Sequence, residues 1–380
     1  MSDLKVQKRK INLMIAAAGL NIGGAEVVIK HLVQTIDRER FNITVCCIKV
    51  SGVIGDELSR DGVDIVTLSN PSESRVNYFT FRKLLRIIRS KQIDIVHTHT
   101  TDALADAAIC KLFMPKFRLI HTFHFGNYPN LRSRYLWMEQ VFSRLADRLI
   151  AVGEVQRRQI MDVFCFHENR IGRVWNGIAF GSNESDGEFR MRVGAENCIL
   201  IGTIATLIEQ KGLHDLLAVA RQVRDTGRKV RFVVVGDGHL RQELEAMRRA
   251  LGLEETVVFA GWVMNAARVA LPAFDVFFQP SLWEAMSIVI LEAMAAGKPI
   301  VATRVGENTR IIENEVDGFL VKPHDVNGMA EALGRLIDDA GLRCRLGNAA
   351  AEKVAQQFTV EHMTQAYEQI YLETLGGMRI

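Results

Sequence analysis

Short apolar runs alternate with longer amphipathic stretches along the whole chain of 380 residues. Successive residues within each run are apolar, which is typical of parallel strands covered by helices on both faces. In the first half the runs are 11–19, 41–50, 64–69, 94–99, 118–124 and 148–153. In the second half they are 198–205, 229–236, 256–261, 275–281, 299–305 and 318–321. This repeated strand–helix–strand order predicts an α/β fold with two doubly wound domains.

Two domains suit this length, because a single core rarely grows beyond about 250–300 residues. The polar stretch GSNESDGE at 181–188 divides the two halves and is the predicted linker. We expect an N-terminal domain at 1–182, a C-terminal domain at 183–358, and a C-terminal helix within 359–380 that can pack back on the N-terminal domain. Ligands of such sheets bind beyond the carboxyl ends of the strands, so we expect the site in a cleft between two facing domains.

The composition is that of a globular protein, with 48% hydrophobic and 24% charged residues. A net charge of +3 gives no reason to expect a nucleic-acid partner. The six cysteines show no C-x-x-C spacing, which indicates reduced thiols rather than disulfides or a zinc site. No run reaches the roughly 18 apolar residues of a membrane span, and the N-terminus lacks the pattern of a signal peptide. These features predict a soluble, cytoplasmic protein.

Glycines and histidines follow the predicted strands of the first half. Gly23 and Gly24 precede a predicted helix, where they serve either a phosphate site or a tight turn. They do not form G-x-G-x-x-G, which disfavours a nicotinamide dehydrogenase. The histidines at strand ends are His97, His99, His121 and His124. No carboxylate lies close by to complete a metal set, so we favour substrate contact for His124, the one nearest a strand end and its glycine.

In the second half, Lys211 lies at a turn that opens a helix, where an ammonium can meet a phosphate. Gly236 and Gly238 end another strand close to a helix start. On their own these are weak indications, because most lysines are merely solvated.

The segment 280–299, PSLWEAMSIVILEAMAAGKP, carries two carboxylates in an otherwise apolar stretch. Its pattern predicts a strand that ends near Ser281 and a helix from about Ser287, an acceptable N-cap, to about Ala296. Glu284 would then lie in the loop ahead of the helix. Glu292 would lie inside the helix, where an unpaired buried carboxylate costs several kcal/mol. It therefore needs a hydroxyl or cationic partner, unless it pairs with Lys298 or faces solvent.

Taken together, these motifs resemble the retaining glycosyltransferases of family 4, which have two Rossmann-like domains in the GT-B fold. The likeness covers nearly the whole chain. Its anchors are GGAE (23–26), DIVHTH (94–99), RVWNGI (173–178), EQKG (209–212), VVGDG (234–238) and the E-x7-E pair at Glu284 and Glu292 followed by AMAAGKPIVAT. The resemblance implies transfer of a hexose from a nucleotide-diphosphate sugar to an acceptor hydroxyl, in the synthesis of cell-surface polysaccharide or glycolipid.

The resemblance also implies roles for individual residues. Glu292 would bind the ribose hydroxyls, and His124, Glu284 and Lys211 would act at the reacting centre, with Lys211 neutralising the departing diphosphate. The nucleotide and diphosphate would contact Gly23, Gly24, Thr206, Lys211, Gly236, Val263 and Glu292. The donor sugar would contact His124, Glu284, Ala285, Met286, Ser287 and Ile288. The chain contains no D-x-D motif, so neither a metal nor another cofactor is expected, and the resemblance implies retention of configuration.

Three positions depart from the family pattern. Thr206 stands where an arginine usually precedes the lysine by five residues, and Arg304 or Arg310 are candidates to compensate. Ala285–Met286–Ser287 replaces the usual G-F-G, which narrows the pocket and bears on the choice of donor. Arg310 also occupies a position that is commonly acidic. These departures keep two alternatives open: a catalytically impaired nucleotide-sugar-binding protein, and a GT-B sugar-nucleotide epimerase.

The segment 78–92 combines apolar residues with five cations. Such a basic amphipathic helix suits an anionic membrane surface, which would place the protein peripherally on the inner face of the membrane and favour a glycolipid or lipid-linked acceptor. The more common explanation of this pattern is a layer helix with a solvated basic face.

Overall fold

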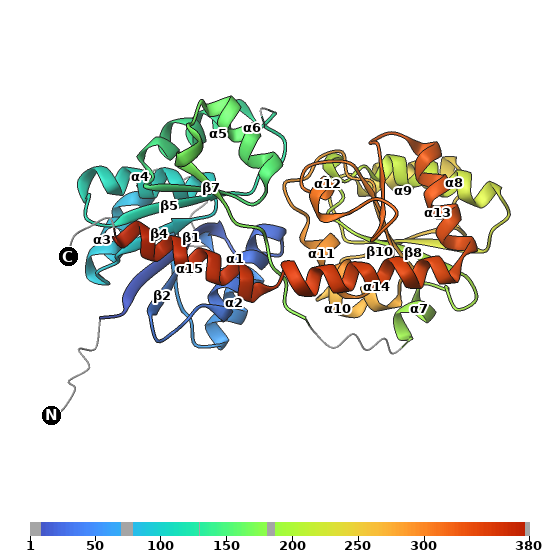
Figure 1. Cartoon of the computed structure of the whole chain (residues 1–380), viewed down its shortest axis with the longest axis horizontal. Helices are drawn as coiled ribbons and strands as arrows, with labels where there is room; N and C mark the ends of the chain where they lie inside the picture. The colour runs from blue at the N-terminus through green and yellow to red at the C-terminus, as the bar shows by residue number, and fades with distance from the viewer. Residues whose placement is uncertain (1–8, 70–78, 129, 181–186, 377–380) are drawn as a thin grey trace. The chain divides into compact units, whose positions relative to one another are not determined.

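The computed structural model describes residues 9–69, 79–128, 130–180 and 187–376. It divides into two compact units (Figure 1). Unit 1 comprises Met1–Gly177 and Val360–Ile380, and unit 2 comprises Ile178–Thr359. The predicted boundary after residue 182, with most of the predicted linker, lies outside the described residues.

Unit 1 is built on a seven-stranded parallel sheet in the order β3-β2-β1-β4-β5-β6-β7. The strands are β1 (Ile11–Gly19), β2 (Phe41–Val50), β3 (Asp64–Thr67), β4 (Ile95–Thr98), β5 (Arg118–Phe123), β6 (Arg148–Ala151) and β7 (Ile171–Arg173). The helices between them are α1 (Gly24–Thr35), α2 (Gly52–Arg60), α3 (Thr80–Ser90), α4 (Thr101–Phe113), α5 (Ser133–Phe142) and α6 (Glu154–Phe164), with short 3-10 turns η1 (Ser143–Leu145) and η2 (Glu168–Arg170). The three residues of β7 are too few to show a pattern in the sequence, and this strand was not predicted.

Unit 2 contains a six-stranded parallel sheet in the order β10-β9-β8-β11-β12-β13. The strands are β8 (Ile199–Ile204), β9 (Val230–Val235), β10 (Val257–Gly261), β11 (Val276–Gln279), β12 (Ile300–Thr303) and β13 (Phe319–Val321). The helices are α7 (Glu188–Arg192), α8 (Leu213–Asp225), α9 (Arg241–Ala250), α10 (Ala266–Val269), α11 (Ile288–Ala295), α12 (Asn308–Ile311), α13 (Val326–Asp338) and α14 (Ala340–Gln357), with 3-10 turns η3 (Glu209–Lys211) and η4 (Leu271–Ala273). The prediction of two doubly wound α/β sheets is confirmed.

Burial on both faces explains why the strands are apolar at successive positions. In β1, an interior strand of the sheet in unit 1, residues 13–17 are almost completely buried. In β11, Val276, Phe277 and Phe278 are fully buried. Phe277 lies opposite both Gly202 of β8 and Ile300 of β12 in parallel register. Because the neighbouring strands run in the same direction, their carboxyl ends meet at one edge of the sheet, and the loops after β8, β11 and β12 lie together there.

The last helix, α15 (Val360–Gly376), belongs to unit 1 although it follows unit 2 in the chain. It packs along α1, where Thr364 contacts Thr35 through their hydroxyl oxygens at 2.5 Å. Tyr367 and Tyr371 of this helix are fully buried, and the Tyr371 hydroxyl lies 2.7 Å from Nδ1 of His97. These contacts explain why α15 stays with unit 1.

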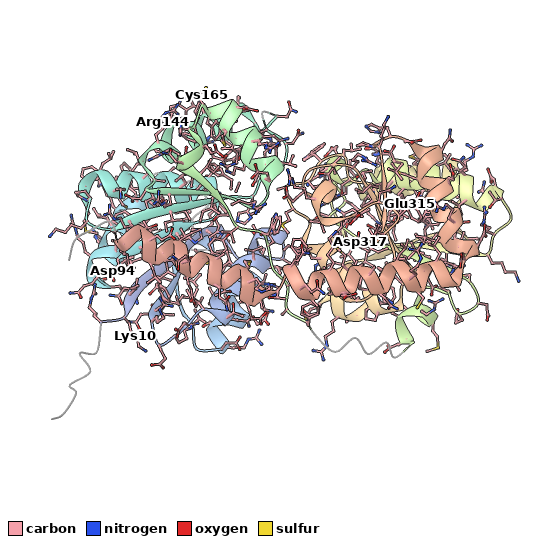
Figure 2. The ribbon with its side chains drawn as sticks, viewed as in Figure 1. Lys10, Asp94, Arg144, Cys165, Glu315 and Asp317 are labelled. Atoms are coloured by element: carbon pink, nitrogen blue, oxygen red, sulfur yellow. The ribbon has the colours of Figure 1, made fainter. Side chains whose placement is uncertain are left out.

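Helix α14 is anchored within unit 2 by a charged contact. Lys353 donates to the buried carboxylate of Asp317 at 2.7 Å, and Figure 2 labels Asp317 beside this helix. Over the described parts of both units, no helix combines the length and the apolar character needed to cross a membrane.

Candidate active site

The loop between β11 and α11 forms the centre of the site. Strand β11 ends at Gln279, two residues before the predicted end, and α11 begins at Ile288 with Ser287 as its N-cap. The Ser287 hydroxyl accepts from the amide of Ile290 at 3.4 Å, as the predicted cap requires. Gly297, with φ of 65°, follows the C-cap of α11. The predicted helix is therefore confirmed to within a residue at each end.

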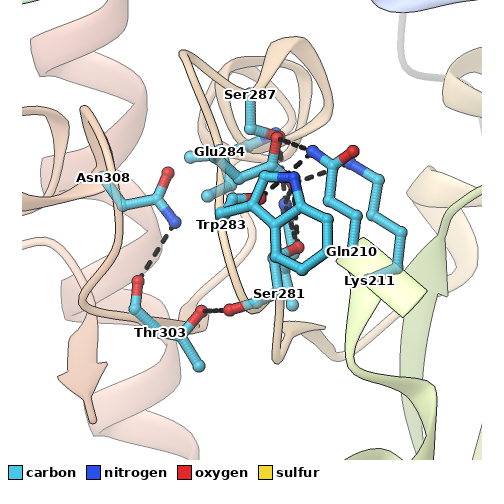
Figure 3. Close-up of polar contacts among 10 residues, drawn as sticks. Gln210, Lys211, Ser281, Trp283, Glu284, Ser287, Thr303 and Asn308 are labelled. Atoms are coloured by element: carbon cyan, nitrogen blue, oxygen red, sulfur yellow. Dashed lines mark hydrogen bonds and ion pairs between the residues drawn. The ribbon is translucent and has the colours of Figure 1, made fainter. Parts of the chain in front are cut away.

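Glu284 lies in this loop and is 6% exposed. Its carboxylate accepts four side-chain hydrogen bonds (Figure 3). The donors are Lys211 at 2.6 Å, Gln279 at 2.8 Å and Ser281 at 2.8 Å, all to Oε1, and Gln210 at 3.2 Å to Oε2. Lys211 and Gln210 come from η3, so the loops after β8 and β11 meet at this carboxylate. These four donors replace the hydrogen bonds to water that the carboxylate loses on burial.

A second set of contacts holds the loop itself. Ser287 donates to Oε1 of Gln279 at 3.1 Å, which orients the amide that reaches Glu284. Thr303, at the end of β12, donates to the backbone carbonyl of Ser281 at 2.5 Å. The amide side chain of Asn308 donates to the carbonyl of Thr303 at 3.1 Å. Rigid positioning of this kind is what a binding or catalytic group needs.

Gly306, in the turn after β12, packs directly against the loop between β11 and α11. Its φ is 48°, and a Cβ at this position would lie 2.0 Å from the carbonyl oxygen of Glu284. The amide of Glu307 then donates to the carbonyl of Ala285 at 3.1 Å. Only glycine allows this approach, so Gly306 positions the loop. The sequence offered one signal for it, a glycine just after a strand.

Glu292 lies in the middle of α11 and is half-buried. Its side chain has no hydrogen-bond or ionic partner among residues 9–69, 79–128, 130–180 and 187–376, and burial raises its pKa to about 7. Lys298 instead donates to the carbonyl of Pro272 at 2.7 Å, so the alternative of a Glu292–Lys298 salt bridge is wrong. Glu292 therefore retains unused acceptor capacity.

The glycines after β9 have a structural reason within unit 2. A Cβ on Gly236 would lie 2.0 Å from the carbonyl oxygen of Ala205, and one on Gly238 would lie 2.5 Å from that of Leu207. The loop after β9 thus packs closely on the loop after β8, which carries Thr206 in an exposed position. Val263 follows β10 and is half-buried.

In unit 1, Gly23 is the N-cap of α1, and the amide of Val27 donates to its carbonyl at 3.0 Å. The carboxylate of Glu26 folds back beside it, since a Cβ on Gly23 would lie 2.4 Å from Oε2 of Glu26. Burial raises the pKa of Glu26. A carboxylate thus occupies the space next to the predicted phosphate-binding glycines Gly23 and Gly24.

The histidines of unit 1 form a buried polar cluster. His97 lies between the hydroxyls of Tyr371 at 2.7 Å and Thr122 at 2.8 Å, and His99 contacts His124 at 2.9 Å. Burial lowers the pKa of His124 to about 4. Within the described residues, no three His, Cys, Asp or Glu side chains are grouped to share one metal ion. Sequence reasoning noted these histidines but missed the tyrosines of α15, because nothing local indicates where that helix packs.

Two family models match the chain, one for each half. The model "Glycosyltransferase Family 4" matches residues 22–180, and "Glycosyl transferases group 1" matches residues 196–339. The chain is 24% identical to a UDP-Gal:alpha-D-GlcNAc-diphosphoundecaprenol alpha-1,3-galactosyltransferase of Escherichia coli, with 93% of this chain and 94% of the relative covered. It is 34% identical to the lipopolysaccharide core biosynthesis glycosyltransferase LpsE of Rhizobium meliloti, over 45% of this chain and 49% of that protein.

Solved structures agree on the fold. The Anabaena protein HepE in complex with UDP-glucose superposes with a TM-score of 0.84 at 22% identity, covering 97% of this chain and all of HepE. The sucrose-phosphate synthase of Thermosynechococcus elongatus superposes with a TM-score of 0.82 at 17% identity. The two parallel sheets, the ordered motifs and the matches in both halves lead to one conclusion: the chain belongs to the GT-B glycosyltransferases of group 1 and family 4.

Proposed function

We propose that this glycosyltransferase moves a hexose from a UDP-sugar to the hydroxyl of a glycolipid or lipid-linked acceptor, with retention and without a metal. The observation that carries the proposal is the largely buried Glu284–Lys211 pair ahead of α11, together with the Glu292 carboxylate in that helix, which has no partner among the described residues. The Escherichia coli relative is named for a UDP-sugar donor and a diphosphoundecaprenol-linked acceptor, which supports the choice of donor and acceptor.

Glu292 is proposed to bind the ribose. Two adjacent ribose hydroxyls can donate hydrogen bonds to the half-buried carboxylate of Glu292, which has no other partner among the described residues. Hydrogen bonds from a ligand favour the ionised form, so nucleotide binding would lower the raised pKa of Glu292. Affinity for the nucleotide is therefore expected to weaken when this side chain loses its charge.

Glu284 and Lys211 are proposed to act at the reacting centre. Breaking the anomeric bond leaves positive charge on the sugar and two negative charges on the diphosphate. In this proposal the Lys211 ammonium, which lies 2.6 Å from Glu284, neutralises the diphosphate, and the amides at the start of α11 donate to sugar hydroxyls. His124 of unit 1 is proposed as a further contact to the donor sugar.

The test is nucleotide release from UDP-, GDP- and ADP-sugars, with and without short lipid-linked acceptors. UDP release that depends on acceptor, persists in EDTA and yields a product with the anomeric configuration of the donor supports every part of the proposal. Glu292→Gln should raise the KM for the donor, whereas Glu284→Gln should lower kcat. The proposal is wrong if none of these donors is turned over, and wrong in its choice of base if a GDP- or ADP-sugar is preferred.

We also propose that unit 1 binds anionic membranes peripherally, through a different surface from the one the sequence suggests. Residue 78, the start of the predicted segment, lies outside the described residues. Leu84 and Ile88 of α3 are fully buried, and Leu85 and Ile87 pack against the core of unit 1. The apolar face of this helix is therefore occupied, as the layer-helix explanation predicts.

The candidate surface lies instead where α3 meets the end of α4. Phe79, Leu112 and Phe113 are 57%, 65% and 63% exposed, and the rings of Phe81 and Phe113 stack with their centroids 6.4 Å apart. The cations Arg82, Arg86 and Arg89 are exposed on α3. Exposed aromatic and aliphatic side chains beside cations suit insertion among anionic headgroups, where each cation contributes about 1 kcal/mol.

Sedimentation with vesicles tests this second proposal. The protein should sediment with vesicles that contain phosphatidylglycerol and not with pure phosphatidylcholine. The double variant Leu112→Ser and Phe113→Ser should lose binding while its nucleotide release is unchanged. The matched control is Met191→Ser in unit 2, which removes a side chain that is 60% exposed and should keep binding. Equal binding by the double variant would refute the assignment.

A further inference from the structure

One face of the sheet in unit 1 carries polar side chains that reach from α15 to His124. His97 contacts the Tyr371 hydroxyl of α15 with one ring nitrogen and Thr122 with the other. The ring of His97 lies 4.1 Å from that of His99, centroid to centroid. His99 then contacts His124, the residue proposed above to touch the donor sugar. His124 is thus connected to α15 through His97 and His99.

The contact between His99 and His124 joins Nδ1 of the first to Nε2 of the second at 2.9 Å. Burial lowers the pKa of His124 to about 4 and that of His99 well below its ordinary value, so both rings are neutral at pH 7. A neutral imidazole has one N–H donor and one bare nitrogen acceptor. A single proton therefore lies between the two rings, and its position decides the tautomer of each.

The other nitrogen of His99 decides between the two arrangements. Nε2 of His99 is buried and has no hydrogen-bond partner in the described part of the chain. If His124 donated, His99 would have to carry its own proton on that buried, unpaired nitrogen. If His99 donates from Nδ1, the unpaired nitrogen is a bare acceptor. Buried unpaired N–H groups are rarer than unpaired acceptors, so donation from His99 is favoured.

The neighbouring residue His121 follows the same rule on the opposite face of the strands. The hydroxyl of Thr98 donates to the carbonyl of Ile120 at 3.2 Å, so its oxygen accepts from Nδ1–H of His121 at 2.9 Å. Nε2 of His121 is then the bare nitrogen, and it too is buried without a partner among the described residues. The contacts of His99 and His121 thus favour the same arrangement, donation from Nδ1 with a bare Nε2 that has no partner among the described residues.

We propose that His99 is a positioning residue that donates from Nδ1 to Nε2 of His124 and fixes the proton of His124 on Nδ1. His124 is half-buried, and its Nδ1 has no partner among the side chains and backbone that the structure describes. Nδ1–H of His124 is consequently a hydrogen-bond donor that can bind an acceptor oxygen, and it cannot accept a hydrogen bond from a sugar hydroxyl. The assignment of that oxygen to the donor sugar or its phosphate rests on the proposed function, whereas the tautomer does not.

Nitrogen-15 NMR of the full-length protein labelled at its histidines tests the tautomer directly. We expect a protonated Nδ1 and a bare Nε2 for His124, with its signals identified by their absence from a His124→Gln variant. A proton on Nε2 of His124 in the wild-type protein overturns the proposal. This readout needs no activity, so it separates failure of the inference from failure of the proposed function.

Two matched variants then test the role of His99. Asn in place of His99 keeps a donor near the position of Nδ1, whereas Asp has the same shape and can only accept. His99→Asn should keep the tautomer of His124 and most of kcat/KM. His99→Asp should move the proton to Nε2 and lower kcat/KM about tenfold, the loss typical of one hydrogen bond. The same tautomer of His124 in both variants would contradict the positioning role.

Discussion

Replacing Lys211 with methionine tests the buried pair at the start of α11, because methionine keeps most of the side-chain length and removes the ammonium. The side chains of Lys211 and Glu284 are 20% and 6% exposed. Removing one partner of a buried pair costs about 3–5 kcal/mol of unfolding free energy. Glu284 keeps three neutral donors in the variant, so we expect a loss of about 2–3 kcal/mol.

The companion variant Glu284→Gln removes the carboxylate charge and leaves Lys211 partly in water. Its expected cost is about 1 kcal/mol. The double variant buries no unpaired charge, so its free energy of unfolding should fall by about 1–2 kcal/mol, which is less than the sum of the two single effects. The expected coupling between the two residues is therefore about 2 kcal/mol.

Urea unfolding followed by tryptophan fluorescence measures these changes. Trp283 is a local probe, because its carbonyl accepts from Gln210 at 3.1 Å beside the pair. The transition of unit 2 should shift in Lys211→Met, while the transition of unit 1 stays in place. Effects that add to within about 0.5 kcal/mol would show that the two charges do not stabilise each other.

Three further variants probe other features of the fold. The pKa of Glu292 is raised from 4.5 to about 7, so ionisation of this side chain destabilises the folded state. Its contribution to the free energy of unfolding is fully present below pH 4.5 and is lost as the pH rises through 7. Glu292→Gln should remove about 2–3 kcal/mol of that loss, measured by urea unfolding at pH 5 and pH 8. Gly306→Ala should abolish nucleotide release and destabilise unit 2 by more than the control Gly227→Ala. Gly227 has a similarly positive φ of 78°, but a Cβ there would meet nothing within 4 Å. Equal urea midpoints for the two variants would contradict the argument from the close contact of Gly306. Tyr371→Phe should lower stability by about 1 kcal/mol by removing the hydroxyl that contacts His97, and no change in urea midpoint would show that this contact is not stabilising.

Local patterns determined most of the secondary structure. Runs of successive apolar residues predicted β1 and β11, because strands covered on both faces need no polar alternation. Ser287 and Gly297 predicted both ends of α11, because a serine hydroxyl caps free amides and glycine adopts positive φ at low cost. These signals act over a few residues, so they can be interpreted without the rest of the chain.

The partners of Glu284 were decided by tertiary structure. Lys211 and Gln210 lie more than 70 positions before it, and Gly306 reaches its loop from beyond β12. Sequence spacing placed an acid ahead of a helix and a lysine after a strand, but only the parallel register of β8, β11 and β12 brings those loops to one edge of the sheet.

The packing of α15 and the contact between His99 and His124 have the same origin. An amphipathic helix shows which of its faces is buried but not what it packs against, and a histidine shows its two nitrogens but not which one carries the proton. Both points are resolved by Tyr371 and by Nε2 of His99, which has no partner in the described part of the chain, because hydrogen bonding within a buried cluster depends on neighbours that are distant in the chain.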